Sequence, residues 1–411
     1  MSLNTQPYKG TRDFYPEDKR IQKYMFGKIR SVVESFGYQE YDAPILESFD
    51  IYAAKTGEEI VNEQLYYFED KGGRKVAIRP EMTPSVSRMV AARRQELAYP
   101  LRWYSIPNLW RYEQPQRGRL REHWQLNVDI FGVEGLEGDA EIIQVADAVL
   151  QGFGASRDMY EIRINSRKLL QKRIEAAGPK TDVADITRLI DHFEKLSQDE
   201  FKASLADKVE NPGELFDFLT KDGGSEETKH LEELLNSIGI TNVRFVPSLA
   251  RGFDYYTDIV FEVFDTNPEN NRSMFGGGRY DGLVALFGVE PVPTVGFGMG
   301  DVTLRNFLES HDLLPKLSPE TDAIAILIGD VYNSAQKVLS ELRSKGVNIA
   351  VDSSGRKLDM QLKHAIKSGT RYALFIGEAE LSSGQFKLRD LEKGREQQLP
   401  LDQVAETLGV R

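Results

Sequence analysis

The chain has 411 residues, of which 40% are hydrophobic and 28% charged, a globular composition long enough for two or three domains. Its formal net charge of −12 excludes a general nucleic-acid coat protein, although an enzyme that touches RNA through local basic patches stays possible. Cysteine is absent, which excludes disulfides and thiolate metal sites and fits a cytoplasmic location. We expect no transmembrane helix and no secretory signal, because no long apolar run and no basic-then-apolar start are present.

The first region, residues 8–154, mixes long helices with strong strands. Residues 17–36 are predicted to form an amphipathic helix that ends at Gly37. Residues 101–132 contain two strand-like runs around a connection rich in Pro, Gly and Arg, residues 114–121. Because side chains alternate along a strand, the second run places one apolar face opposite one polar face. The apolar face holds Trp124, Leu126, Val128 and Ile130, and the polar face holds Gln125, Asn127 and Asp129.

Arginine and carboxylate side chains gather around these runs. Arg111 and Glu113 share a face of the first run, and the connection supplies Arg117, Arg119 and Arg121. Such a set suits a polyanionic ligand. A solvated face of an antiparallel sheet explains the same pattern equally well, so the residues alone leave both interpretations open.

The second region, residues 166–242, is helical and charged, with breaks at glycine and proline clusters. Strand-like sequence resumes at Phe245, so a strand-rich domain is predicted to carry a helical insertion. Residues 249–264 then place a polar turn before a strand. The candidate binding residues there are Arg251, Asp254, Tyr255 and Tyr256, although a capped turn with half-buried tyrosines is the simpler interpretation.

Two glycine-rich stretches follow, and neither has the spacing of a phosphate-cradling loop or a dinucleotide fingerprint. Residues 275–282 are predicted to be too rich in glycine for a regular element, and residues 296–300 alone are a weak motif. The histidines show no metal-ligand spacing, so we expect each to be a surface or packing residue; they are His123, His192, His230, His311 and His364.

Residues 311–319 are predicted to be a linker, since they contain two prolines. Beyond them, strand-like and helical runs alternate, which predicts a small α/β domain with a largely parallel sheet. From Thr321 onward thirteen basic residues face twelve acidic ones, so the acidic excess lies in the preceding part of the chain.

Several of these stretches together resemble the histidyl-tRNA synthetases, a family of class II aminoacyl-tRNA synthetases. Residues 9–16 and 78–83 look like family segments, and residues 110–132 are similar to class II motif 2 in its histidine-specific form. The two signatures peculiar to the family are matched by residues 249–256 and 276–282. Residues 351–358 and 371–378 resemble its anticodon-binding domain, so the likeness covers nearly the whole chain in the family's order.

The resemblance implies an α+β catalytic core, a class II synthetase-like twisted antiparallel sheet with flanking helices. This domain would span residues 1–320, with the helical insertion at about 167–243. A C-terminal α/β anticodon-binding domain would span residues 321–411. The resemblance further implies a cytoplasmic homodimer that uses ATP with Mg²⁺ to activate L-histidine and then loads it onto tRNA(His).

The resemblance also implies roles for single residues. Arg111 and Arg251 would be catalytic and grip the ATP α-phosphate, with Glu113 at the adenine amino group and Arg119 at the outer phosphates. The histidine substrate would also contact Arg111 and Arg251. Glu81 and Thr83 would bind its ammonium group and Gln125 its main-chain end. The imidazole would be bound by Asp129, Tyr255 and Tyr256. No protein side-chain motif for a metal is expected.

One departure from the family pattern concerns ATP. The family usually has a Glu-Arg pair after the last glycine stretch, where this chain has Val302 and Thr303. Arg305 lies about 200° around the helix from residue 303 and cannot simply replace the arginine. Either another residue covers the adenine, or the chain belongs to a subgroup with a different ATP grip, or ATP use is weakened.

Two alternatives to a working synthetase follow. One is a histidine-binding paralogue without catalysis, resembling the regulatory subunit of ATP phosphoribosyltransferase. The other is an RNA-binding or stress-sensing module. The presence of a C-terminal domain and of Arg111, Arg119 and Arg251 favours the synthetase.

Overall fold

The computed structural model describes residues 3–53, 63–221, 224–251, 255–270 and 272–409. They divide into two compact units: residues up to Phe14 with Gln22–Leu314, and Tyr15–Ile21 with Pro315–Arg411. Among the described helices, none combines the length and the apolar character that a membrane span requires.

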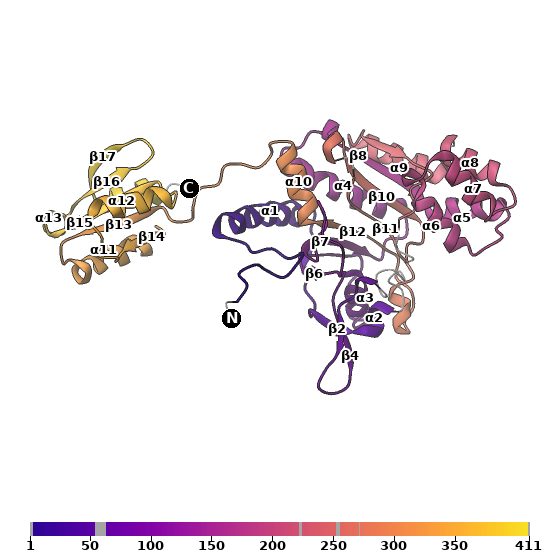
Figure 1. Ribbon diagram of the computed structural model, residues 1–411, viewed down its shortest axis with the longest axis horizontal. Coiled ribbons are helices and arrows are strands. Elements are labelled where there is room, and N and C mark those ends of the chain that lie inside the picture. The colour runs from indigo at the N-terminus through magenta and orange to yellow at the C-terminus, as the bar shows by residue number, and fades with distance from the viewer. Residues whose placement is uncertain (1–2, 54–62, 222–223, 252–254, 271, 410–411) are drawn as a thin grey trace. The chain divides into compact units, whose positions relative to one another are not determined.

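A broad sheet forms the centre of the first unit (Figure 1). In the described residues its strand order is β1-β5-β7-β12-β11-β10-β8-β9, with β6 paired to β7. The pairings from β5 to β8 are antiparallel, as predicted, but β1 pairs with β5 and β9 pairs with β8 in parallel. The strands are β1 (Gln39–Glu40), β5 (Leu101–Ser105), β6 (Asn108–Trp110), β7 (Glu122–Phe131), β8 (Tyr160–Ser166), β9 (Val243–Phe245), β10 (Ile259–Asp265), β11 (Ser273–Arg279) and β12 (Thr294–Gly300).

Two details of this sheet correct the sequence-based expectations. The glycine-rich residues 275–282 were predicted to be irregular, but most of them belong to the regular strand β11. The first strand-like run is broken into β5 and β6, and Arg111 and Glu113 follow β6 rather than sharing a strand face. Pro107 lies at the break, where a strand lacks the N–H that a ladder hydrogen bond needs.

The helices α4 (Leu136–Gly152) and α10 (Asp301–Ser310) pack against this sheet and bury apolar surface. The predicted N-terminal helix is confirmed as α1 (Pro16–Ser35), which buries Met25, Ile29 and Val33. A smaller antiparallel sheet, with order β2-β4-β3, lies beside α2 (Phe49–Ala53) and α3 (Thr83–Ala92). Its strands are β2 (Leu46–Ser48), β3 (Tyr67–Glu69) and β4 (Lys75–Ile78).

The predicted helical insertion is present between β8 and β9. Ser166, Asp182 and Ser197 each cap the helix that follows by accepting a hydrogen bond from a backbone N–H of its first turn. The first four helices share a core of their own, α5 (Arg167–Ala176), α6 (Val183–Asp191), α7 (Gln198–Ala206) and α8 (Pro212–Lys221). The last, α9 (Glu226–Ser237), packs instead against α4 and the edge of the large sheet.

The second unit has a five-stranded sheet of order β14-β13-β15-β16-β17. The first two pairings are parallel, as predicted, but a C-terminal hairpin adds two antiparallel pairings, so the sheet is mixed. The strands are β13 (Ala323–Ile328), β14 (Ile349–Asp352), β15 (Tyr372–Gly377), β16 (Gln385–Asp390) and β17 (Arg395–Pro400). The helices are α11 (Tyr332–Ser344), α12 (Leu358–Lys367), α13 (Glu378–Ser383) and α14 (Leu401–Gly409).

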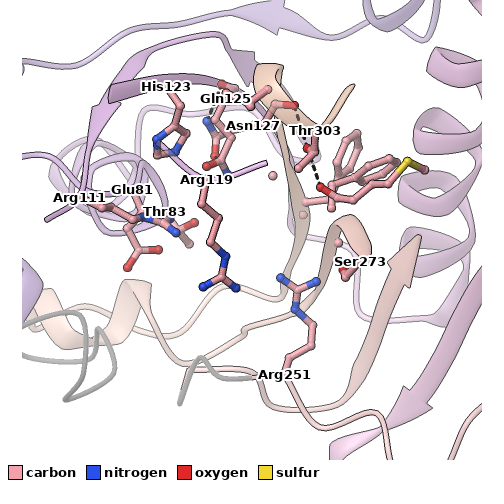
Figure 2. Close-up of a pocket in the computed structure, with 18 of the residues that line it drawn as sticks. Glu81, Thr83, Arg111, Arg119, His123, Gln125, Asn127, Arg251, Ser273 and Thr303 are labelled. Atoms are coloured by element: carbon pink, nitrogen blue, oxygen red, sulfur yellow. Dashed lines mark hydrogen bonds between the residues drawn. The ribbon is translucent and has the colours of Figure 1, made fainter. Parts of the chain in front are cut away.

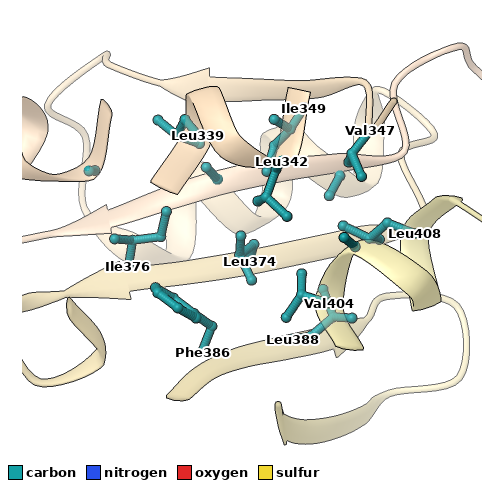
Figure 3. Close-up of a cluster of buried hydrophobic side chains, with 14 residues drawn as sticks. Leu339, Leu342, Val347, Ile349, Leu374, Ile376, Phe386, Leu388, Val404 and Leu408 are labelled. Atoms are coloured by element: carbon teal, nitrogen blue, oxygen red, sulfur yellow. The ribbon is translucent and has the colours of Figure 1, made fainter. Parts of the chain in front are cut away.

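Apolar side chains cover both faces of this sheet. Leu374 and Ile376 face α11 and α14, where they join a buried cluster with Leu339, Leu342 and Val404 (Figure 3). On the other face, Ile324 and Ile326 of β13 and Ala373 and Phe375 of β15 pack with α12 in a second cluster. A strand buried on both faces reads as a continuous apolar run, which is why its position was predictable.

Candidate active site

One cavity of the first unit brings together every residue that the resemblance assigned to ATP or histidine. Asp254, which was noted in the same turn as Arg251, lies outside the described residues. The contributors are far apart in the chain, from the start of α3 to the turn before β10 (Figure 2). The predicted residues that line it are Glu81, Thr83, Arg111, Glu113, Arg119, Gln125, Asp129, Arg251, Tyr255 and Tyr256.

The floor of the cavity is the polar face of β7, whose alternation matches the prediction. Its apolar face is buried, with Leu126, Val128 and Ile130 almost without exposure. Each polar residue lies opposite a glycine of β12: Gln125 opposite Gly300, Asn127 opposite Gly298 and Asp129 opposite Gly296. A Cβ atom on Gly298 would lie 1.7 Å from Nε2 of Gln125, and one on Gly296 would lie 2.2 Å from Oδ1 of Asp129. The glycine stretch therefore leaves room for the polar side chains of β7.

Asp129 is among the most buried polar residues of the cavity and is only 3% exposed. Its Oδ1 accepts a hydrogen bond from the hydroxyl group of Tyr280. Burial raises the pKa of the Asp129 carboxyl to about 7, and the Tyr280 hydrogen bond opposes part of that rise. Tyr255 and Tyr256 lie beside it, and the Tyr255 hydroxyl donates to Glu81 at 3.1 Å. This end of the cavity offers a buried carboxylate among aromatic rings, which suits a small polar ring with N–H donors.

Guanidinium groups from three segments also line the cavity. Arg111 donates from Nε to the carbonyl oxygen of Pro80 at 2.9 Å, and its Nη1 lies 4.0 Å from Glu113. Arg119 comes from the predicted connection, where a short hairpin pairs Gln116 with Arg119. Figure 2 shows the Arg119 and Arg251 side chains pointing toward each other across the cavity. Cations that converge in a cleft repel each other unless an anion lies between them, so the geometry favours a polyphosphate.

Arg251 has an unusual backbone for a residue with a side chain, because its φ of 55° is in the left-handed region. Such conformations persist where the surrounding structure enforces them, and they are concentrated at functional sites.

Sequence reasoning missed part of the cavity wall. His123 was expected to be a surface or packing residue, but it lines the cavity beside Gln125. Burial, with the positive charges of Arg111 and Arg12, lowers the pKa of the His123 imidazole to about 3, so the ring is neutral. Its position two residues before Gln125 on β7 was the available signal. Tyr280 lies within the family signature at residues 276–282, which was the available signal for it, whereas nothing in the sequence pointed to Ser273.

Val302 and Thr303 also line the cavity, at the start of α10. The Thr303 hydroxyl donates to the carbonyl oxygen of Met274 at 2.8 Å, which ties α10 to β11. Arg305 pairs with Glu309 at 2.8 Å and is not among the residues that line the cavity, as its position on the helix predicted.

An antiparallel sheet whose cavity combines guanidinium, carboxylate and tyrosine side chains, with a separate C-terminal α/β unit, is the arrangement of a class II aminoacyl-tRNA synthetase. The family model for histidyl-tRNA synthetase matches residues 10–302, and the model for the anticodon binding domain matches residues 323–411. The chain therefore belongs to the histidyl-tRNA synthetase family.

Individual relatives support this membership. The histidine–tRNA ligase of Leptospira biflexa is 45% identical over 412 residues, covering 95% of this chain and 94% of the relative. The histidine–tRNA ligase of Thermoplasma volcanium is 38% identical and covers 96% of each chain. Among solved structures, the apo histidyl-tRNA synthetase of S. aureus superimposes with a TM-score of 0.76 at 26% identity, over 99% of this chain and 100% of the other.

Proposed function

We propose that this chain is a histidine–tRNA ligase, which joins L-histidine to ATP as histidyl-adenylate and then transfers the histidyl group to tRNA(His). The observation that carries the proposal is the convergence of Arg111, Arg119 and Arg251 on one cavity that Asp129 also lines. Relatives named histidine–tRNA ligase match over nearly the full length, including the C-terminal domain, which supports a ligase over a regulatory paralogue.

In the first step an oxygen of the histidine carboxylate attacks the α-phosphorus, and pyrophosphate leaves. The protein has little covalent work to do, so positioning and charge stabilisation dominate. We assign the α-phosphate to Arg111 and Arg251, because a planar guanidinium can hold two oxygens at fixed geometry. Glu113 would accept from the adenine amino group, and Arg119 would bind the outer phosphates. Mg²⁺ bound with ATP would neutralise further phosphate charge.

Histidine would occupy the Asp129 end of the cavity. Glu81 and Thr83 would bind the ammonium group, and Gln125 the main-chain end. Asp129 and Tyr256 would fix the imidazole, with Tyr255 beside it. The bond between Tyr280 and Asp129 would hold this carboxylate in place. Because a wrong side chain would leave these buried groups unpaired, discrimination of about 10⁴ is expected without editing.

In the second step a hydroxyl group of the 3′-terminal ribose of tRNA would attack the carbonyl carbon of the adenylate, and AMP would leave. We assign recognition of the anticodon to residues 321–411, of which residues 323–411 match the anticodon-binding model. The extra 5′ guanosine that the family usually senses is assigned to the connection at residues 114–121.

We also propose a cytoplasmic homodimer. The small sheet of the first unit leaves large apolar side chains exposed, which favours burial against a second copy; Leu46 is 48% exposed, Tyr67 53% and Phe68 45%. Sedimentation equilibrium should give twice the chain mass, and a monomer at micromolar concentration would contradict this part.

Exchange of labelled pyrophosphate into ATP tests the main proposal. Purified protein should support exchange when histidine is added and not with the other nineteen amino acids. A lack of exchange with every amino acid would favour the histidine-binding regulatory alternative.

A further inference from the structure

A residue of the helical insertion, Arg167, holds the backbone of Arg251 in its left-handed conformation. Arg167, the first residue of α5, donates from Nη1 to the carbonyl oxygens of Ala250 at 2.7 Å and Arg251 at 3.3 Å. These bonds fix the two peptide groups on either side of the strained residue. The part of the Arg251 side chain nearest the backbone therefore has a defined position before any ligand binds.

The far end of the side chain is held by β10. Its Nη1 donates to the carbonyl oxygen of Phe261 at 3.2 Å and lies 3.3 Å from Oε1 of Glu262. Both side chains of this ion pair are largely buried, with Arg251 12% and Glu262 19% exposed. A charge-assisted contact in such surroundings is stronger than one in water.

A glycine provides the space for this contact. Gly276 of β11 lies directly opposite Glu262 in the β10–β11 pairing. A Cβ atom at Gly276 would lie 1.8 Å from Nη1 of Arg251, so the guanidinium occupies the place where a side chain would otherwise stand. The space left by the missing side chain of Gly276, here called the slot, and the carboxylate of Glu262 together select one orientation of the guanidinium.

This anchoring uses one nitrogen of the guanidinium. The Nε atom of Arg251 is buried and has no hydrogen-bond partner among the described residues. A buried donor without a partner is costly. The anchor on Nη1 leaves the other N–H donors of the guanidinium, on a residue that lines the cavity, available to a ligand there.

We infer that Glu262 is a positioning residue for Arg251: its carboxylate, reached through the slot at Gly276, holds the guanidinium in the orientation that meets the α-phosphate. This inference rests on the proposed function, because it assigns Arg251 a role in adenylate formation. Glu262 itself is not among the residues that line the cavity. Its negative charge also offsets the repulsion among the cations that converge on the cavity.

Glu262→Gln tests the inference, because glutamine keeps the volume and an acceptor oxygen while it removes the charge. We expect kcat for histidine-dependent pyrophosphate exchange to fall by about 10- to 100-fold, as a misplacement of about 1 Å in the active site can do. The KM for histidine and the thermal midpoint should stay close to those of the wild type. Glu262→Asp, which keeps the charge, should recover part of kcat.

Glu161→Gln is the matched control. Glu161 lies on β8, next to β10, and also pairs with arginines, Arg163 at 2.8 Å and Arg244 at 3.2 Å, but neither of these arginines lines the cavity. Because the ion pairs of Glu161 are only structural, Glu161→Gln should change the rate of pyrophosphate exchange little. If Glu262→Gln behaves like Glu161→Gln, or loses thermal stability and KM along with kcat, the positioning role is overturned.

A second variant separates this inference from the proposed function. In an Arg251→Lys background, followed by single-turnover adenylate formation at enzyme excess, adding Glu262→Gln should cause little further loss. Equal losses in both backgrounds would overturn the role of Glu262 and leave that of Arg251 intact. Full activity of Arg251→Lys would overturn the assigned role of Arg251 and with it that of Glu262.

Discussion

At the scale of single residues, the Asp129 carboxyl combines deep burial with a specific hydrogen bond from Tyr280. Asp129→Asn should reduce kcat/KM for histidine by about 10²- to 10³-fold, because the imidazole loses a charged acceptor. The KM for ATP should change by less than about 3-fold. Equal losses for both substrates in pyrophosphate exchange would contradict the role assigned to Asp129.

The same carboxyl should also control stability. Its pKa is raised by burial from the ordinary 3.8 to about 7, so the folded protein binds the proton more tightly than the unfolded chain. The free energy of unfolding should therefore fall as the pH rises from about 4 through 7, by at most about 4 kcal/mol at 1.36 kcal/mol per pKa unit. The variant Asp129→Asn has no carboxyl to titrate at this position, so its free energy of unfolding should lack this fall with pH.

Urea denaturation of the ligand-free protein checks this sign. The midpoint of Asp129→Asn relative to the wild type should be higher at pH 8 than at pH 4.5. A difference between the two proteins that does not depend on pH would contradict the buried, perturbed carboxyl.

Part of this site could be predicted from the sequence alone. The period of two along β7 places Gln125 and Asp129 on one face, and that alternation is a local property of a strand. The partnership of Asp129 with Tyr280 joins residues 151 positions apart, and no local pattern encodes it. The assignment of Arg251 came from a family signature, and its anchoring by Glu262 needed the register of two strands.

At the scale of elements, the glycine-rich strand β11 determines how closely the central strands approach each other. A Cβ atom at Gly277 would lie 2.1 Å from the carbonyl oxygen of Gly296, a backbone atom that cannot move aside. Gly277→Ala should therefore destabilise the first unit by about 3 kcal/mol or more. Gly282→Ala, where a Cβ atom meets nothing within 4 Å, is the control and should change stability by less than about 1 kcal/mol.

Thermal unfolding followed by circular dichroism distinguishes these two variants. Similar midpoints for both would show that the sheet tolerates a side chain at residue 277. The sequence-based prediction of irregular structure at residues 275–282 was wrong because glycine has a low strand propensity when judged locally. Here strand pairing on both sides, with β10 and β12, overrides that propensity.

At the scale of the whole molecule, the chain divides into two units with separate hydrophobic cores. We propose that residues 1–320 contain the whole machinery for adenylate formation. A truncated chain of these residues should retain histidine-dependent pyrophosphate exchange within about tenfold of the full chain, while charging of tRNA falls by more. Loss of exchange in a truncated chain that keeps its secondary structure would contradict this division of labour.

The order of domains was predictable because helical and strand-like periods change abruptly near residues 166, 243 and 320. The mixed character of the C-terminal sheet was not, since the β16–β17 hairpin has little apolar alternation in its second strand, where residues 395–398 are exposed.

The most direct test of the account is a crystal structure of the protein with histidine and a non-hydrolysable ATP analogue. The account predicts the imidazole within hydrogen-bond distance of the Asp129 carboxylate and the α-phosphate oxygens bonded by both Arg111 and Arg251. An α-phosphate bound by neither arginine, or an imidazole bound away from Asp129, would contradict it.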